Sequence, residues 1–185
     1  AMKRCWFVDS KGLVESGRAG LQDHKKPYAR AHAPVADLLG AVKALRPPAL
    51  IGASGQAAQF TEEIIREMSR LNERPIIFAL SNPTSNSECT AEQAYGWSRG
   101  KALFASGSPF APVSLDGRTH VSGQCNNAYI FPGVGMAVVA TGARRVTDEM
   151  FSAAARALAG LVSEDDLAQG CLMPPMSKIN DVSAR

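Results

Sequence analysis

The sequence is short of the features that mark membrane-spanning and nucleic-acid-binding chains. Its apolar runs are too short to cross a bilayer, and its amino terminus lacks the charged-then-apolar order of a secretory signal. The net charge is only +3 at a pI near 8.8, and no run of Lys and Arg interleaves with aromatic side chains. These absences predict a soluble chain that binds neither membranes nor nucleic acid.

Cysteine is scarce, and its spacing excludes the common cysteine-based sites. The four thiols form neither a Cys-x-x-Cys pair nor a cluster with zinc-ligand spacing; they are Cys5, Cys89, Cys125 and Cys171. We expect free thiols in a reducing compartment, and a regulatory disulfide stays the alternative because the sequence supplies no distances. The expected compartment is the cytoplasm; the alternative is a plastid or another organelle, reached after removal of a transit peptide that is not in this chain.

Length and composition allow one good hydrophobic core. With 185 residues, 45% of them hydrophobic, the chain can form a single domain, which we place at residues 3–185. There is no internal repeat and no low-complexity segment.

The most informative stretch is a buried strand that ends in polar groups. Residues 75–80 are almost wholly apolar, as in a strand covered on both faces of a parallel sheet, and they stop at Ser81-Asn82-Pro83. Ligands of open α/β sheets bind beyond the carboxyl ends of the strands, so the Asn82 amide is expected to project into a cleft. Thr90 and Gln93 then form a capping-box pattern that predicts the start of a helix.

Strands and helices alternate through the first two thirds of the chain. We expect strands at 5–8, 49–53, 75–80 and 102–106, with helices at 34–45 and 60–71 and another after Thr90. A hairpin is expected to pair 113–115 with 119–121 around Asp116-Gly117. Three helices should follow: 133–142, packed closely under the site, 147–161 with Met150, Phe151, Ala154 and Leu158 facing inward, and one starting at Ser163. This rhythm predicts an α/β fold with a Rossmann-like, doubly wound parallel sheet and C-terminal helices.

Candidate binding groups occur after several of these strands. Asp9, at the end of the first strand, is placed to hold the ribose of a dinucleotide, and Ser10 and the Lys25-Lys26 pair could hold a ribose 2′-phosphate. The alternative is that the two lysines are a solvated loop pair. Gly52 and Gly55 allow a tight turn after the second strand, although the segment is not a G-x-G-x-x-G fingerprint.

Two adjacent amides stand beside an aromatic, apolar segment. The side chains of Asn126 and Asn127 can hold a carboxylate or a carboxamide without adding charge. The alternative is that they only cap or turn the chain, since Asn is favoured in turns.

Three motifs in a fixed order resemble one family. They are SNPTSNSECTAEQAY from Ser81, LFASGSPF from Leu103 and GQCNNAYIFPGVG from Gly123. Together they closely resemble the malic enzymes, which oxidatively decarboxylate malate to pyruvate, and the resemblance runs from Trp6 to Ser183. It implies a partial NAD(P)-binding domain, truncated at its first βα unit.

The resemblance assigns roles to several candidates. It implies that Ser10 and Lys26 favour NADP over the alternative NAD, and that Ser54 and Gly55 line the cofactor site. Asn82 would contact the nicotinamide and the substrate, and Asn127 would bind the malate carboxylate beside Asn126. The family's catalytic Lys and Tyr, its Mg or Mn ligands and its first glycine-rich loop would all precede this chain. We therefore assign no catalytic or metal residue here and expect the isolated chain to be inactive.

Other functions stay open on the sequence alone. A noncatalytic nucleotide-binding or assembly module of Rossmann type is the alternative, and a different dehydrogenase is disfavoured because the Asn motifs would need another explanation. The expected partners are malate or pyruvate as the small-molecule substrate. A homo-oligomer is also expected, because an uncovered strand edge promotes self-association.

Overall fold

The computed structural model describes residues 4–184 and has a mixed α/β architecture. Lys3 and Arg185, the ends of the expected domain, lie outside the described residues. One sheet of four parallel strands forms its centre: β3 (Ala49–Gly52), β4 (Ile76–Ala79), β5 (Leu103–Ser106) and β8 (Gly123–Gln124), in the order β3-β4-β5-β8. The expected α/β fold with a Rossmann-like parallel sheet and C-terminal helices is confirmed.

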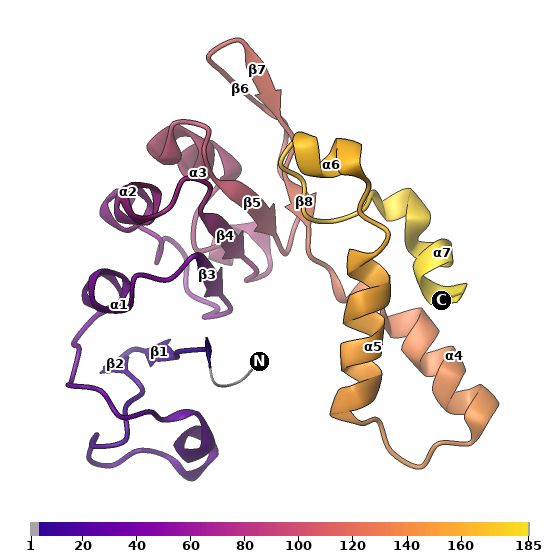
Figure 1. Ribbon diagram of the computed structural model, residues 1–185, viewed down its shortest axis with the longest axis horizontal. Helices are drawn as coiled ribbons and strands as arrows, with labels where there is room; N and C mark the ends of the chain where they lie inside the picture. Colours follow the sequence, from indigo (N-terminus) through magenta and orange to yellow (C-terminus); the bar gives the residue numbers. More distant parts are fainter. Residues whose placement is uncertain (1–3, 185) are drawn as a thin grey trace.

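Three amphipathic helices cover one side of the sheet (Figure 1). They are α1 (Leu38–Leu45), α2 (Glu62–Leu71) and α3 (Ala91–Ser98), and they pack in that order, α1 on α2 and α2 on α3. Their apolar faces meet the strands in a core that includes Ile65, Met68, Ile77 and Phe104, each at most 1% exposed. Burial of these side chains fixes the strands, and with them the loops that carry the candidate residues.

The capping box that the sequence predicts at Thr90 is present. The Thr90 hydroxyl accepts the Gln93 N–H at 3.1 Å, and the Gln93 side chain accepts the Thr90 N–H at 2.9 Å. Two of the four N–H groups that lack an intrahelical partner at the start of α3 are thereby satisfied, so local hydrogen bonds set where this helix begins.

The first strand differs from expectation. Instead of a sheet strand at 5–8, the chain forms a small antiparallel hairpin from β1 (Val8–Asp9) and β2 (Gly12–Leu13). Gly12 has φ +95°, and a side chain there would lie 2.1 Å from the Val35 carbonyl, so only glycine allows the chain to turn back at this place. This reversal places β1 outside the four-stranded sheet.

A second hairpin projects from the sheet between β5 and β8 (Figure 1). It consists of β6 (Val113–Leu115) and β7 (Arg118–His120), joined by Asp116 and Gly117, both of which have positive φ. The expected hairpin is confirmed, and its two-residue turn is of the kind that Asp-Gly favours. The short strand β8 was not expected.

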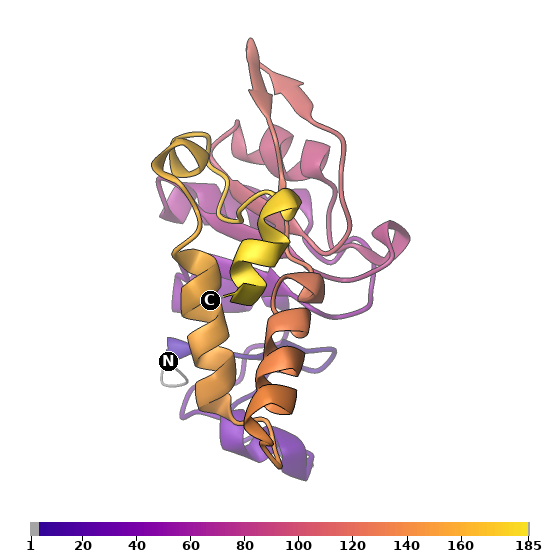
Figure 2. The ribbon, with the colours of Figure 1, turned by 90° about the vertical axis from the view of Figure 1, so that its right-hand side faces the viewer.

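The C-terminal helices form a separate layer at the end of the molecule opposite α1–α3, and Figure 2 shows them in front of the sheet. They are α4 (Phe131–Thr141), α5 (Asp148–Ala159), α6 (Glu164–Ala168) and α7 (Ile179–Ala184). Short 3₁₀ turns complete the chain: η2 (Asp23–Tyr28), η3 (Thr84–Asn86), η4 (Asn127–Tyr129) and η5 (Met176–Lys178). The helix α4 contacts α5, α7 and η4.

The expected close packing of α4 is wrong, and the inward face expected for α5 is present only in part. Its predicted members Met150, Ala154 and Leu158 are half-buried. No residue of α4 is buried, with Val139 83% exposed, and Phe151 of α5 is half exposed. A helix that is apolar on all sides is normally buried. Here the described partners of α4 leave its outer face open, so the pattern predicted the helix correctly and its surroundings incorrectly.

Among residues 4–184, no helix is both long and apolar enough to cross a membrane.

Candidate functional site

The carboxyl ends of the four parallel strands bring most of the candidate residues to one side of the molecule. Ser54 and Gly55 follow β3, Asn82 follows β4, and Asn126 and Asn127 follow β8. Loops in this position form the ligand site of open α/β sheets. The structure therefore places five of the eight candidates along one end of the sheet. The strands before Ser54, Gly55 and Asn82 were predicted, whereas β8, which precedes Asn126 and Asn127, was not.

The turn after β3 is held against the protein interior by hydrogen bonds that Ser54 and Gly55 donate. The Ser54 N–H and hydroxyl both donate to one oxygen of Glu88, at 2.9 and 2.8 Å, and the Gly55 N–H donates to the Ser81 hydroxyl at 2.9 Å. At Gly55, φ is +67° and the space beside Cα is open. The hydroxyl of Ser54 therefore points into the protein, and the open face of this turn is its glycine backbone.

Glu88 is a functional candidate that the sequence reading missed. Its side chain is 0% exposed and also accepts the Ser81 hydroxyl at 2.5 Å and the Ser81 N–H at 3.3 Å. Burial raises the pKa of this carboxyl, but the hydrogen bonds from Ser81 and Ser54 outweigh it and the pKa lies below its ordinary value. The sequence did hold one signal, because Glu88 is the only charged residue between Arg74 and Glu92.

Asn82 joins the loops that follow β4 and β5. Its amide oxygen accepts the Ser108 hydroxyl at 2.5 Å, and its side chain is exposed. A side chain at Gly107 would lie 2.4 Å from the Leu80 carbonyl and 2.7 Å from the Asn82 amide nitrogen. Glycine at 107 is therefore needed for this amide to sit against the neighbouring loop.

The two adjacent asparagines have different surroundings. The Asn126 amide oxygen accepts the Ala128 N–H at 2.9 Å and so caps the turn η4, whereas the Asn127 side chain is exposed. The strand β8 positions both, since the Cys125 N–H donates to the Ser106 carbonyl at 2.8 Å. The capping alternative describes what Asn126 does in this structure, and Asn127 is the amide that remains directed outward.

Asp9 lies in a charged cluster beside the β1–β2 hairpin. One of its oxygens is 2.5 Å from an Arg18 nitrogen and 2.6 Å from the Lys25 ammonium, and the other accepts from Arg18 at 3.0 Å and from the Lys11 N–H at 2.9 Å. The Arg18 hydrogen bond, assisted by Lys25, holds the pKa of Asp9 well below its ordinary value. The carboxylate is therefore charged and more than neutralised by its two cationic partners.

Ser10 and Lys26 stand apart from that cluster. Ser10 is exposed in the hairpin turn, and the Lys26 ammonium lies 2.6 Å from Asp23 with its side chain 64% exposed. Of the two adjacent lysines, Lys25 is the one that contacts Asp9. The sequence reading missed Arg18, because nothing local links a residue nine positions away to the end of β1.

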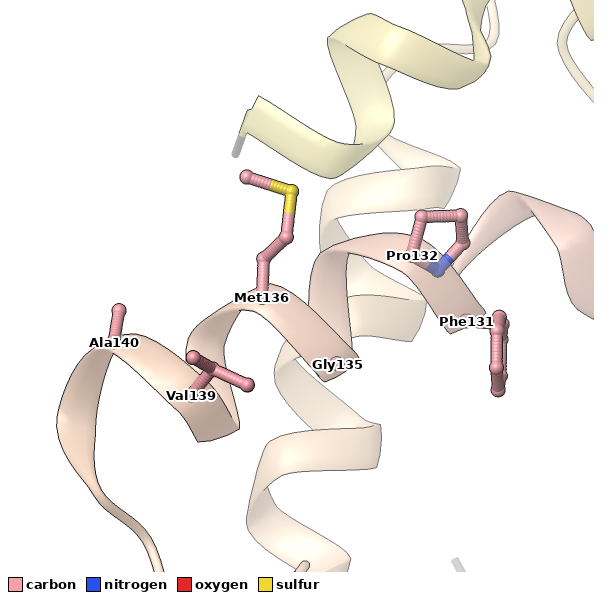
Figure 3. A pocket seen from close by; sticks show the side chains of 6 residues that line it. All are labelled: Phe131, Pro132, Gly135, Met136, Val139 and Ala140. Atoms are coloured by element: carbon pink, nitrogen blue, oxygen red, sulfur yellow. The ribbon is translucent and has the colours of Figure 1, made fainter.

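Two hollows differ in chemistry. One of about 390 Å³ lies beside the Asp9 cluster and includes Lys11, Glu15 and Arg18 in its wall. The other, of about 490 Å³, lies on α4 and is lined only by Phe131, Pro132, Gly135, Met136, Val139 and Ala140 (Figure 3). Only the first offers the polar groups that orient a ligand.

No cluster suited to a metal ion occurs in the part of the chain that the structure describes. Among residues 4–184 there is no group of three or more His, Cys, Asp or Glu side chains that could hold one.

Comparison with known proteins gives a consistent result. The family model "Malic enzyme, NAD binding domain" matches residues 1–185. The chain is 57% identical over 184 residues to "NADP-dependent malic enzyme 1" of Arabidopsis thaliana, covering 99% of this chain and 32% of that protein. It is 56% identical over 183 residues to "NADP-dependent malic enzyme" of Phaseolus vulgaris, covering 98% and 31%. It is 55% identical over 183 residues to "NADP-dependent malic enzyme, chloroplastic" of Zea mays, covering 98% and 29%. The chain thus spans about a third of the length of these relatives.

Proposed function

This chain belongs to the family of malic enzyme NAD-binding domains, and we propose that it forms the cofactor-binding part of an NADP-dependent malic enzyme. The complete enzyme would oxidise malate and release pyruvate and carbon dioxide while reducing NADP. The observation that carries the proposal is identity above 50% along nearly the whole chain to relatives whose names specify NADP.

The Asp9 cluster fits a phosphorylated dinucleotide. A lone acidic residue at this place would repel a 2′-phosphate, but Asp9 is paired with both Arg18 and Lys25. Lys11 adds a third positive charge in the wall of the hollow beside it, against the carboxylate of Glu15. We propose that Asp9 holds the ribose and that Ser10 and Lys26, with Lys25 next to them, receive the 2′-phosphate.

The carboxyl end of the sheet supplies the rest of the proposed site. Gly55 lets the cofactor approach the backbone closely, with Ser54 beside it. The Asn82 amide would orient the nicotinamide and the substrate, and the exposed Asn127 would bind the malate carboxylate, with Asn126 fixing the turn that presents it.

These groups suit binding and orientation rather than the chemical steps of the reaction. Bound NADP supplies the acceptor for the hydride that leaves C2 of malate. The residues of this chain bind and orient, and we assign none of them a proton-transfer or metal-binding role. We propose that the catalytic Lys and Tyr and the Mg or Mn ligands belong to the part of the complete protein outside this chain, and that the isolated chain is therefore inactive.

Assembly and compartment are also proposals. Among the described strands β3 pairs only with β4, and its Ile51 is 62% exposed, which supports self-association through an open strand edge. A monomer at every concentration in sedimentation equilibrium would contradict this. We propose the cytoplasm as the compartment, with a plastid or another organelle as the alternative, and fractionation of the source cells would decide between them.

Malate-dependent reduction of NADP, followed by absorbance with Mn²⁺ present, tests the function. The complete protein should turn over and the 185-residue chain should not. Asn82→Ala should abolish turnover in the complete protein, and Asn180→Ala, an exposed asparagine on α7, should not change it. A complete protein that binds NADP without oxidising malate would instead identify a noncatalytic module.

Cofactor choice has its own test. Lys26→Ala in the complete protein should raise KM for NADP and leave KM for NAD unchanged, because only NADP carries the 2′-phosphate. The matched control is Lys43→Ala, at an exposed lysine of α1. Equal effects of Lys26→Ala on the two cofactors would reject the assignment.

A further inference from the structure

Glu88 is a buried charge for which the proposed chemistry has no direct use. It lies between η3 and α3, and its side chain is 0% exposed. Burying a charge is costly unless it is fully hydrogen-bonded, and Glu88 accepts from four donors. A group retained at that cost is expected to have a role in ordering its surroundings.

The four donors come from two different loops. Two belong to Ser54, in the turn after β3, and two belong to Ser81, in the turn after β4. The Ser81 hydroxyl also accepts the Gly55 N–H at 2.9 Å. We call Glu88, Ser54, Ser81 and Gly55 the Glu88 network.

The backbone beside Glu88 holds the far end of the first loop. The Phe60 N–H donates to the Glu88 carbonyl at 3.0 Å, and the Ala58 N–H donates to the Ser87 carbonyl at 3.1 Å. The loop that leaves β3 is therefore tied to residues 87–88 near its start and near its end.

We propose that Glu88 is a positioning residue for the cofactor: a single carboxylate sets the turn after β3 relative to the turn after β4, so that Gly55 and Asn82 face the dinucleotide together. The inference rests on the proposed function, because it assumes that these two turns contact NADP. Glu88 itself is enclosed and contacts neither cofactor nor substrate.

The division of the contacts between the two oxygens makes the idea testable. Oε1 accepts from the Ser54 N–H, the Ser54 hydroxyl and the Ser81 hydroxyl, whereas Oε2 accepts from the Ser81 N–H at 3.3 Å. In Glu88→Gln the amide oxygen can keep the three contacts of Oε1. The amide NH₂ would then face the Ser81 N–H. Because two donors cannot hydrogen-bond to each other, Ser81 would move away and shift the neighbouring Asn82.

The test uses the complete protein that carries this chain. NADP affinity is measured by titration of intrinsic fluorescence, and KM for NADP and for malate by turnover. Glu88→Gln should weaken NADP binding about tenfold, the loss of one charged hydrogen bond, with kcat within about twofold of wild type. Ser69→Ala is the control, since it removes a part-buried hydroxyl hydrogen bond within α2 that involves neither turn. It should leave the affinity unchanged.

Coupling separates positioning from general destabilisation. Ser54→Ala alone should weaken NADP binding a few-fold. The double variant Ser54→Ala with Glu88→Ala should bind no more weakly than Glu88→Ala alone, because Glu88→Ala already removes the acceptor of the Ser54 hydroxyl. Wild-type affinity in Glu88→Gln, or independent multiplicative losses in the double variant, would overturn the proposal.

Two outcomes keep the proposals distinct. If Glu88→Gln does not fold, Ser81→Ala removes the bridge to Gly55 and must weaken NADP binding for the inference to stand. If the wild-type protein fails to bind NADP, the proposed function fails. If the wild type binds NADP and Glu88→Gln binds it equally well, only the positioning role is overturned.

Discussion

Replacing Gly52 by Ala should destabilise the protein strongly although it adds one methyl group. Gly52 ends β3 under the buried side chain of Glu88. A Cβ there would lie 2.5 and 2.6 Å from two Glu88 carbons and 2.8 Å from the Phe60 ring. Separations under 3.0 Å force a neighbour to move, and Phe60 is itself only 3% exposed.

The loss of stability in Gly52→Ala has two sources, overpacking and the displacement of the Glu88 carboxylate. Overpacking costs about 1–3 kcal/mol. Moving the carboxylate weakens at least one charged hydrogen bond, at about 1.5–3 kcal/mol. The gain from replacing glycine inside a strand offsets about 0.5–1 kcal/mol. The net loss is about 3 kcal/mol, which lowers Tm by roughly 6–12 °C in a chain of this size.

Thermal and urea unfolding, followed by circular dichroism, measure this. The control is Gly96→Ala in α3, where a Cβ meets nothing within 4 Å. The same substitution should there raise stability by about 0.5–1 kcal/mol, because alanine favours the helix. An unchanged urea m-value would show that both values are stabilities. If Gly52→Ala were as stable as wild type, the packing argument at Glu88 would be refuted.

Three further changes test other parts of the structure. Met68→Ala, at a fully buried side chain, should cost about 2–5 kcal/mol in urea unfolding, whereas Met176→Ala, at a side chain 37% exposed, should stay within about 0.5 kcal/mol. Thr90→Ala removes the capping box of α3 and should cost about 1 kcal/mol in thermal unfolding, and no change would reject the cap. Asp9→Asn should lower the free energy of unfolding by about 1 kcal/mol at neutral pH, because it removes the ion pairs with Arg18 and Lys25. Because Arg18 and Lys25 lower the pKa of Asp9, that contribution is present above its ordinary pKa of 3.8 and is lost as pH falls below it. Wild type and variant should therefore converge in acid, and a constant difference across pH would contradict the ion pairs.

Local signals in the sequence were enough for the elements that depend on neighbours in the chain. The apolar run before Ser81 predicted β4, Thr90 with Gln93 predicted the start of α3, and Asp116-Gly117 predicted the hairpin β6–β7. Each of these is set by contacts within a few residues, so short windows contain the information.

What the sequence did not reveal depends on contacts between distant segments. Arg18 reaches Asp9, nine positions away, and Glu88 reaches Ser54, 34 positions away. The residue types alone do not specify such partners, because a surface arginine and a paired one look the same in sequence. The exposure of α4 was missed for a related reason. Its apolar composition predicts that the helix is buried, but it does not specify which segment would cover it.

The order of the strands has a consequence for synthesis. In the sequence β3-β4-β5-β8 each strand joins the outer side of the one made before it, and none must be inserted between two others. A chain emerging from the ribosome can therefore extend the sheet one strand at a time. The turns that hold Ser54 and Asn82 can form once β5 has paired with β4. Asn127 reaches its position only later, after the β6–β7 hairpin has been made and β8 has paired with β5. The nascent chain thus completes the proposed cofactor side of the site before the proposed malate side.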